Sequence, residues 1–159
     1  MYHFSLGRPM RELLQKSAEQ LTAPPAAAVE EFNQKQEKLA TKGNEIFRQR
    51  SDVEKLIGEK NLQMAEDNNR NFARFMASLF ANYDPNVFVE TVLWVFRTYR
   101  CHGFHTTYWA ANLNLWTDLI KAELSDESYE AIYPFYDWLI VNIPKFTKIT
   151  DECVNYENH

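Results

Sequence analysis

The sequence contains few of the residues that interrupt helices or build covalent frameworks. Four glycines and six prolines among 159 residues leave room for long helices. The two cysteines, Cys101 and Cys153, are too few for a disulfide framework and show no metal-binding spacing. We therefore expect a cytoplasmic protein, because free thiols persist in a reducing compartment.

Long apolar runs and an excess of basic residues are also missing. No segment approaches the roughly 18 consecutive apolar residues of a transmembrane helix. The N-terminal residues MYHFSLGRPM lack the continuous apolar segment of a secretory signal. The net charge of −5 argues against nucleic acid or an anionic membrane as a partner.

Aromatic residues and apolar residues at helical spacing are abundant. Aromatics make up 14% of the chain, so the core is bulky or is shaped around something flat. No segment shows the alternation of a strand, and we predict an all-α fold of seven or eight helices. The expected helix starts are Pro9, Ala26, Ser51, Asn61, Pro85, Thr106 or Thr107, and Ser125. The expected breaks are Ala23-Pro24-Pro25, Gly43, Gly58, Gly103 and Pro144, with a loose polar tail after Thr147.

The segment from Pro85 to His102 is expected to be the central helix. Its apolar residues cover nearly the whole circumference, which is typical of a helix packed on several sides. They are Val87, Phe88, Val89, Val92, Leu93, Trp94, Val95, Phe96 and Tyr99. We therefore predict that this helix is the most buried one, with Val92 and Trp94 shielded from solvent in the assembled form.

One face of that helix carries polar residues, namely Glu90, Arg97 and Cys101 beside Trp94. A buried charge is unfavourable unless it is paired, so two interpretations stay open. Either this face reaches the surface or Glu90 helps to neutralise Arg97, or else Arg97 binds an anionic group such as a propionate. Arginine suits that task because its planar guanidinium binds a carboxylate through two hydrogen bonds.

The stretch FRTYRCHGFHTTYW, residues 96–109, gathers further candidates. Cys101 and His102 are adjacent and point about 100° apart on a helix, which disfavours nucleophilic catalysis. His102 and His105 lack the partners of a metal site. The stretch is therefore either a satisfied polar helix end or the border of a flat cofactor that Tyr99, His102 or His105 touches.

Two other sets are ambiguous in the same way. Arg70 and Arg74 are one helical turn apart, and they form either a solvated face or a clamp for carboxylates. Trp109 and Trp116 share a helix face, and they are either plain core or a chromophore wall.

Four segments together resemble the globin superfamily over about residues 26–143: NNRNFARFMASLF, YRCHGF, TTYWAANLNLWTDLI and SYEAIYPFYDWLI. The chain is most similar to the phycobiliprotein branch and its bacterial relatives, the bilin biosynthesis-associated globins. The corner CHGFHTTYW also resembles bacterial sensor globins where their F helix runs into the G helix. The resemblance implies a globin-like domain over residues 26–147, an N-terminal helical extension over residues 1–25 that could form a homodimer, and a polar tail over residues 148–159.

The resemblance also implies a tetrapyrrole ligand. Sensor globins place their haem-binding histidine four residues before the glycine, and that position is Tyr99 here. Phycobiliproteins attach a bilin through a Cys-x-Arg-Asp motif, and its cysteine and aspartate positions are Phe75 and Ser78 here. Histidine-ligated haem and the usual thioether are therefore both disfavoured. Cys101 is the remaining candidate for attachment, but the dipole at a helix C-terminus disfavours its thiolate.

We expect a binding protein and not an enzyme, which binds, carries or senses a bilin such as biliverdin or phycocyanobilin without a covalent bond. One alternative is a cofactor-free sensory or interaction globin, and another is a haem protein that uses a non-standard ligand. Proteins of bilin biosynthesis or of signalling are the candidate partners. The expected binding residues are Arg70, Arg74, Trp94, Arg97, Tyr99, Arg100, Cys101, His102, His105 and Trp109.

Overall fold

The computed structural model describes the backbone of residues 4–157 and the side chains of residues 7–151. This part of the chain forms eight helices and no strand, so the prediction of an all-α fold is confirmed. The helices are α1 (Phe4–Glu19), α2 (Ala26–Arg48), α3 (Val53–Ile57), α4 (Leu62–Ala81), α5 (Pro85–Cys101), α6 (Thr107–Glu123), α7 (Asp126–Val141) and α8 (Ile143–Glu157). Among these helices, none has the length and hydropathy that crossing a bilayer requires.

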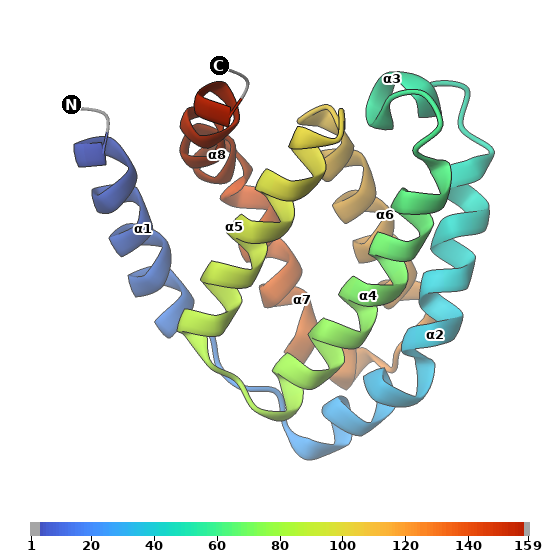
Figure 1. Cartoon of the computed structure of the whole chain (residues 1–159). Coiled ribbons are helices and arrows are strands. Elements are labelled where there is room, and N and C mark those ends of the chain that lie inside the picture. The colour runs from blue at the N-terminus through green and yellow to red at the C-terminus, as the bar shows by residue number, and fades with distance from the viewer. Residues whose placement is uncertain (1–3, 158–159) are drawn as a thin grey trace.

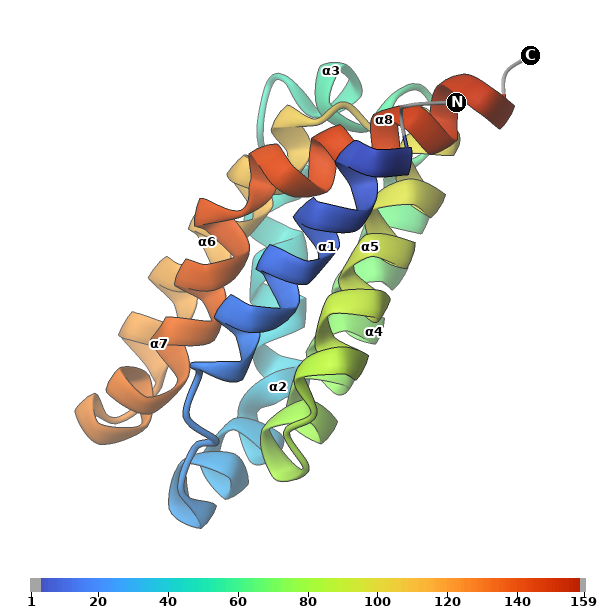
Figure 2. The ribbon, with the colours of Figure 1, turned by 90° about the vertical axis from the view of Figure 1, so that its left-hand side faces the viewer.

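The helices pack in two groups that share one aromatic core. In the first group α2 packs against α4, α6 and α7, and in the second α5 packs against α1 and α8 (Figure 2). Figure 1 shows α4 and α5 standing apart, with α6 and α7 visible between them. The ring of Phe88 on α5 lies 4.8 Å from that of Trp138 on α7, and the ring of Phe96 lies 4.2 Å from that of Trp109 on α6. These contacts hold the two groups together.

Several predicted helix ends are confirmed. Asp84 caps α5, because its carboxylate accepts hydrogen bonds from the backbone amides of Asn86 and Val87. Ser125 caps α7 in the same way, through the backbone amide of Ser128. Gly103 follows α5 with a φ of +99°, a conformation that side chains disfavour.

Other local predictions are wrong. The first helix begins at Phe4 and contains Pro9, so the proline does not open it. Gly43 lies inside α2 and does not break it; a Cβ atom there would lie 3.3 Å from Leu119, so glycine allows α6 to approach. Pro144 does not simply end α7, because it lies in the first turn of α8, where proline is well tolerated.

Two further local features differ from expectation. Ser51 does not cap α3, because the N-cap position is held by Asp52, which makes no side-chain capping bond. The segment after Thr147 is not a loose tail, because the helix α8 continues to Glu157. Residues 158 and 159 of the predicted tail lie outside the described residues.

The predicted N-terminal extension contributes to the common core. Leu14 and Ala18 on α1 are fully buried. The indole nitrogen of Trp138 donates to Ser17 Oγ at 2.8 Å, and the hydroxyl of Tyr83 donates to the carbonyl of Ala18. The apolar side of α1 is therefore occupied by this chain's own core.

The prediction that α5 is apolar and buried on all sides is wrong. Val92 is buried as expected, but Trp94 is 62% exposed and Val87 is 48% exposed. The apolar residues of α5 divide among a core side, a side that faces α4 and a side that faces solvent. A helix with this composition is therefore not the centre of the fold, and two of its apolar sides are incompletely covered.

Candidate functional site

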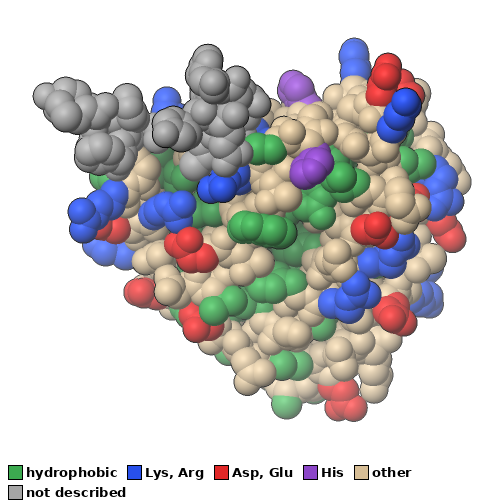
Figure 3. Space-filling view, viewed as in Figure 1, with side chains coloured by type: hydrophobic (Ala, Val, Ile, Leu, Met, Phe, Trp, Pro, Cys, Tyr) green, Lys and Arg blue, Asp and Glu red, His purple; other side chains and the backbone are tan. Residues whose placement is uncertain are grey.

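An apolar groove, called here the α4–α5 groove, lies between α4 and α5 above α6 and α7. Figure 3 shows hydrophobic side chains gathered in this hollow. It is lined by Phe72 of α4, by Val92, Val95 and Phe96 of α5, by Trp109 and Leu113 of α6, and by Leu139 of α7. The enclosed space is about 20 Å³, which holds about one water molecule. The groove is therefore closed by its own side chains.

The groove follows from the way its two helices pack. Since α5 packs mainly on α1 and α8, and α4 mainly on α2, their facing sides cover each other incompletely. Phe72 and Phe75 on α4, and Val95 and Tyr99 on α5, are half-buried and packed against the core. Each pair is spaced by three or four residues, which places it on one side of its helix. The α4–α5 groove is therefore apolar, and the side chains on its two sides are half-exposed.

Trp109 is the largest side chain in this lining and belongs to an aromatic cluster. Its ring is stacked on Phe96, with 4.2 Å between the centroids and 20° between the planes. Tyr99 and Tyr108 contact it edge-on at 6.3 Å and 4.9 Å. Its indole nitrogen is buried and has no hydrogen-bond partner among the described residues. An unpartnered buried donor is unfavourable, so a ligand with a deeply placed acceptor would relieve it.

Tyr99 lies at one end of the groove, and its hydroxyl favours the neutral form. Its ring packs edge-on against Phe104 at 5.1 Å. Burial raises the pKa of Tyr99, and the negative charge of Asp67 on α4 raises it further. The phenolate that would bind a haem iron is therefore disfavoured at neutral pH.

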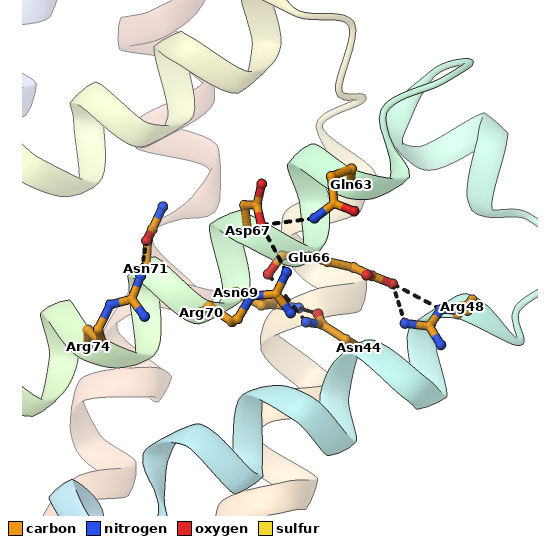
Figure 4. A network of polar contacts seen from close by, with 9 residues as sticks. All are labelled: Asn44, Arg48, Gln63, Glu66, Asp67, Asn69, Arg70, Asn71 and Arg74. Atoms are coloured by element: carbon orange, nitrogen blue, oxygen red, sulfur yellow. Dashed lines mark hydrogen bonds and ion pairs between the residues drawn. The ribbon is translucent and has the colours of Figure 1, made fainter.

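Arg70 and Arg74 lie one turn apart on α4 (Figure 4), and neither is among the residues that line the groove. Arg70 forms an ion pair of 2.9 Å with Asp67, and Arg74 donates to the side-chain oxygen of Asn71. Both contacts stay within one helix and are exposed, so each contributes at most about 1 kcal/mol. The two guanidinium groups are therefore able to exchange these partners for a carboxylate ligand.

Arg100 is placed differently from the expectation of a propionate contact. It donates to the carbonyl of Thr147 at 3.1 Å and to Thr150 Oγ1 at 3.0 Å, and it forms an ion pair with Asp151. All three partners are on α8, so the side chain points away from the groove. Arg100 joins α5 to α8, and its role in this structure is to hold the fold.

Trp94 and Arg97 also lie away from the α4–α5 groove. Together with Glu90 they border a second hollow between α1, α5 and α8. Glu90 accepts two hydrogen bonds of 3.0 Å from Arg11. The interpretation that this face of the helix reaches the surface is confirmed, because all three residues are exposed. Successive residues of a helix point about 100° apart, so the residues from Phe96 to Trp109 cannot all face one ligand. They are divided between the two surfaces.

Cys101, His102 and His105 are exposed at the corner between α5 and α6. His102 Nδ1 donates to the carbonyl of Thr98 at 2.8 Å, and His105 Nδ1 accepts from the backbone amide of Thr107 at 3.2 Å. The backbone amide of His105 donates to the carbonyl of Leu56 at 2.7 Å. Within the described side chains, no group of three or more His, Cys, Asp or Glu is placed to hold a metal ion. The corner is therefore a satisfied polar helix end.

Sequence reasoning missed a buried asparagine network in the first helix group. Asn69 of α4 donates to Asn44 of α2 at 2.8 Å, as Figure 4 shows, and it accepts from Asn112 of α6 at 2.9 Å. The sequence alone did not indicate that these asparagines are buried, because an isolated asparagine in a helical sequence is usually exposed. The useful signal was that Asn69 and Asn112 fall on the apolar sides of their helices.

No family model, no curated protein and no solved structure matches this chain. The α4–α5 groove is the feature that suggests a function. Its apolar lining offers a surface for flat rings, and α4 also carries two arginines that are held only by exposed contacts. This arrangement is suited to binding an apolar ligand that carries carboxylates.

Proposed function

We propose that the chain is a binding protein that holds a linear tetrapyrrole, a bilin such as biliverdin or phycocyanobilin, in the α4–α5 groove without a covalent bond. The observation that carries the proposal is the pairing of an apolar, aromatic groove with the arginines of α4. The whole chain carries a net charge of −5, and Arg70 and Arg74 are the cations of α4 that an anionic ligand in the groove would use.

The globin resemblance belongs to the same proposal. We infer that the helices follow the globin order and that α4 and α5 occupy the places of the two helices that hold a tetrapyrrole in that superfamily. The groove between two incompletely packed helices supports this assignment. Proteins that make a bilin, or that respond to one, are the partners that this function implies.

Binding requires the groove to open, because the enclosed space of about 20 Å³ is far below the roughly 300 Å³ of the smallest usual ligand sites. The half-buried side chains Phe72 and Val95 are the ones that have room to move outward. The rings would then bury apolar surface against Trp109, at about 25 cal/mol per Å². Each propionate contact with Arg70 or Arg74 would add about 1.5–3 kcal/mol as a charge-assisted hydrogen bond.

The placement of Cys101 supports non-covalent binding. The thiol is exposed at the end of α5, on the same side of the helix as Trp94 and not on the side of Val95 and Tyr99. The helix C-terminus also disfavours the thiolate that would attack a bilin. After acid denaturation of a biliverdin complex, we expect no zinc-induced fluorescence in the protein band of a gel.

The experiment is a titration of the purified protein with biliverdin, followed by red absorption and by quenching of tryptophan fluorescence. The double substitution Arg70→Met with Arg74→Met should raise the dissociation constant by about 10–100-fold, since it removes charge-assisted hydrogen bonds. Arg50→Met is the matched control, because Arg50 is an exposed arginine paired with Asp52 far from the groove. Equal affinities of the double variant and the wild type would contradict the arginine clamp.

A second pair of variants tests the groove itself. Val95→Trp places a large ring in the lining and should abolish binding, whereas Val87→Trp on the exposed side of the same helix should not. If haemin binds stoichiometrically and biliverdin does not, the haem alternative replaces this proposal. If neither ligand changes its spectrum, the chain is a cofactor-free interaction protein.

A further inference from the structure

Trp94 is a large apolar side chain that the described part of the chain leaves uncovered. It is 62% exposed, whereas the other three tryptophans, Trp109, Trp116 and Trp138, are at most 5% exposed. Tryptophan is enriched among the residues that contribute most to binding at protein–protein interfaces. The side of α5 around it carries Val87, Thr91 and Thr98, which are uncharged.

A hollow of about 220 Å³ lies directly beside Trp94. It is lined by Arg11 of α1, by Glu90, Leu93, Trp94 and Arg97 of α5, and by Ile149 and Thr150 of α8. Leu93 and Ile149 give it an apolar floor, because both are buried core residues. An indole side chain is of similar size to this space. The projecting ring and a hollow able to receive it thus belong to one surface patch.

We propose that this patch binds a second copy of the same chain in a two-fold symmetric dimer, with Trp94 of each copy in the hollow of the other. A two-fold interface uses the same patch on both copies, so it needs a projection and a recess side by side. It also needs charges of both signs, so that like charges do not meet. Glu90 and Arg97 lie two turns apart on one face of α5, on either side of Trp94, so an antiparallel approach of the two α5 helices brings Glu90 of one copy opposite Arg97 of the other.

The surroundings of the hollow also suit an indole chemically. The guanidinium groups of Arg11 and Arg97 lie at its edge, where they can stack on the entering ring. The carboxylate of Glu90, which is paired with Arg11 of its own copy, is half-exposed at the same edge. This inference does not depend on the proposed ligand, because the patch lies on a different side of α5 from the α4–α5 groove.

The test is sedimentation equilibrium over a wide concentration range, on wild-type chain and on Trp94→Ala. The wild type should form dimers, and Trp94→Ala should raise the dimer dissociation constant at least about tenfold, as the loss of a tryptophan hot spot does. Ile46→Ala is the matched control, because Ile46 is 48% exposed on α2, which packs against α4, α6 and α7 instead. A wild type that is monomeric throughout, or a Trp94→Ala variant that dimerises equally well, would overturn the proposal.

Two measurements test the pairing without relying on one variant. Trp94 is the exposed tryptophan, so dimerisation should shift the fluorescence emission of the wild type to shorter wavelength as concentration rises. Arg97→Glu should weaken the dimer because it faces Glu90 of the other copy, and adding Glu90→Gln, which can still accept a hydrogen bond from Arg11, should restore it. An emission maximum that is independent of concentration while dimers form, or no recovery in the double variant, would place the dimer interface elsewhere.

Discussion

The side-chain amide of Asn112 donates a hydrogen bond of 2.9 Å to Asn69, although the two residues are only 1% and 2% exposed. The same oxygen of Asn69 accepts from the indole nitrogen of Trp116 at 3.2 Å, and the amide nitrogen of Asn69 donates to Asn44 at 2.8 Å. Asn69 thus links α2, α4 and α6 through three contacts. Most buried polar groups are paired, and through its three contacts this residue helps to fix how the three helices fit together.

Replacing Asn69 with alanine should be strongly destabilising. The substitution leaves Asn44, Asn112 and Trp116 without their partner in the interior, and each unpaired buried group is unfavourable by about 1–3 kcal/mol. We expect the free energy of unfolding in urea to fall by about 3 kcal/mol or more. Asn71→Ala is the control, because Asn71 is exposed on the same helix and should change stability by less than about 0.5 kcal/mol. Equal effects of the two substitutions would show that the network contributes no net stability.

Glu31 of α2 should make stability depend on pH. Its carboxylate accepts hydrogen bonds from Lys35 at 2.9 Å, Ser128 Oγ at 2.7 Å, and both the amide and the hydroxyl of Ser125 at 2.8 Å. These bonds, with the one from Lys35 the strongest, lower the pKa of Glu31 from 4.5 to about 2. The charged form is favoured by folding, so its stabilisation is complete above pH 4.5 and is lost as the pH falls towards 2.

Glu31→Gln should therefore be less stable than the wild type by about 2 kcal/mol at pH 7, with the difference shrinking below pH 4.5. The measurement is urea unfolding at a series of pH values. Glu30→Gln is the control, since Glu30 is exposed and its only recorded bond is to Gln34 at 3.4 Å. A stability difference that stays constant from pH 7 to pH 2.5 would contradict this account of Glu31.

Arg100 and Arg74 should have opposite effects when each is replaced by methionine. Arg100→Met removes the bonds to Thr147, Thr150 and Asp151 that hold α8 on α5, and should lower the free energy of unfolding by about 2 kcal/mol. Arg74→Met removes an exposed contact and should leave stability within about 0.5 kcal/mol. In the biliverdin titration the order should reverse, with Arg74→Met the weaker binder. Weaker binding by Arg100→Met than by Arg74→Met would place the anionic end of the ligand near α8.

The sequence predicted the positions of the helices better than it predicted which neighbours each helix contacts. Helical spacing and caps such as Asp84 and Ser125 are local signals, and they placed most helices within a few residues. The burial of α5 was mispredicted because composition does not tell which neighbours a helix has; α1 and α8 cover one side of it and leave Trp94 exposed. For the same reason, the sequence did not show that the residues from Phe96 to Trp109 face two different surfaces. Whether Arg100 reaches a ligand or α8 depends on a residue 51 positions further on, Asp151, and such a contact has no local signature.

Tyr99 provides a test of the haem alternative. Since burial and the charge of Asp67 both raise the pKa of Tyr99, its phenolate is disfavoured at neutral pH, and the enclosed space beside it is about 20 Å³. Haemin added to the purified chain should therefore bind weakly and give no iron–phenolate absorption band at pH 7. Tyr99→Phe should leave the haemin spectrum unchanged, and Asp67→Asn should lower the pKa of Tyr99 in a spectrophotometric titration. Tight haemin binding with a phenolate band that disappears in Tyr99→Phe would instead make Tyr99 a haem ligand and the groove a haem site.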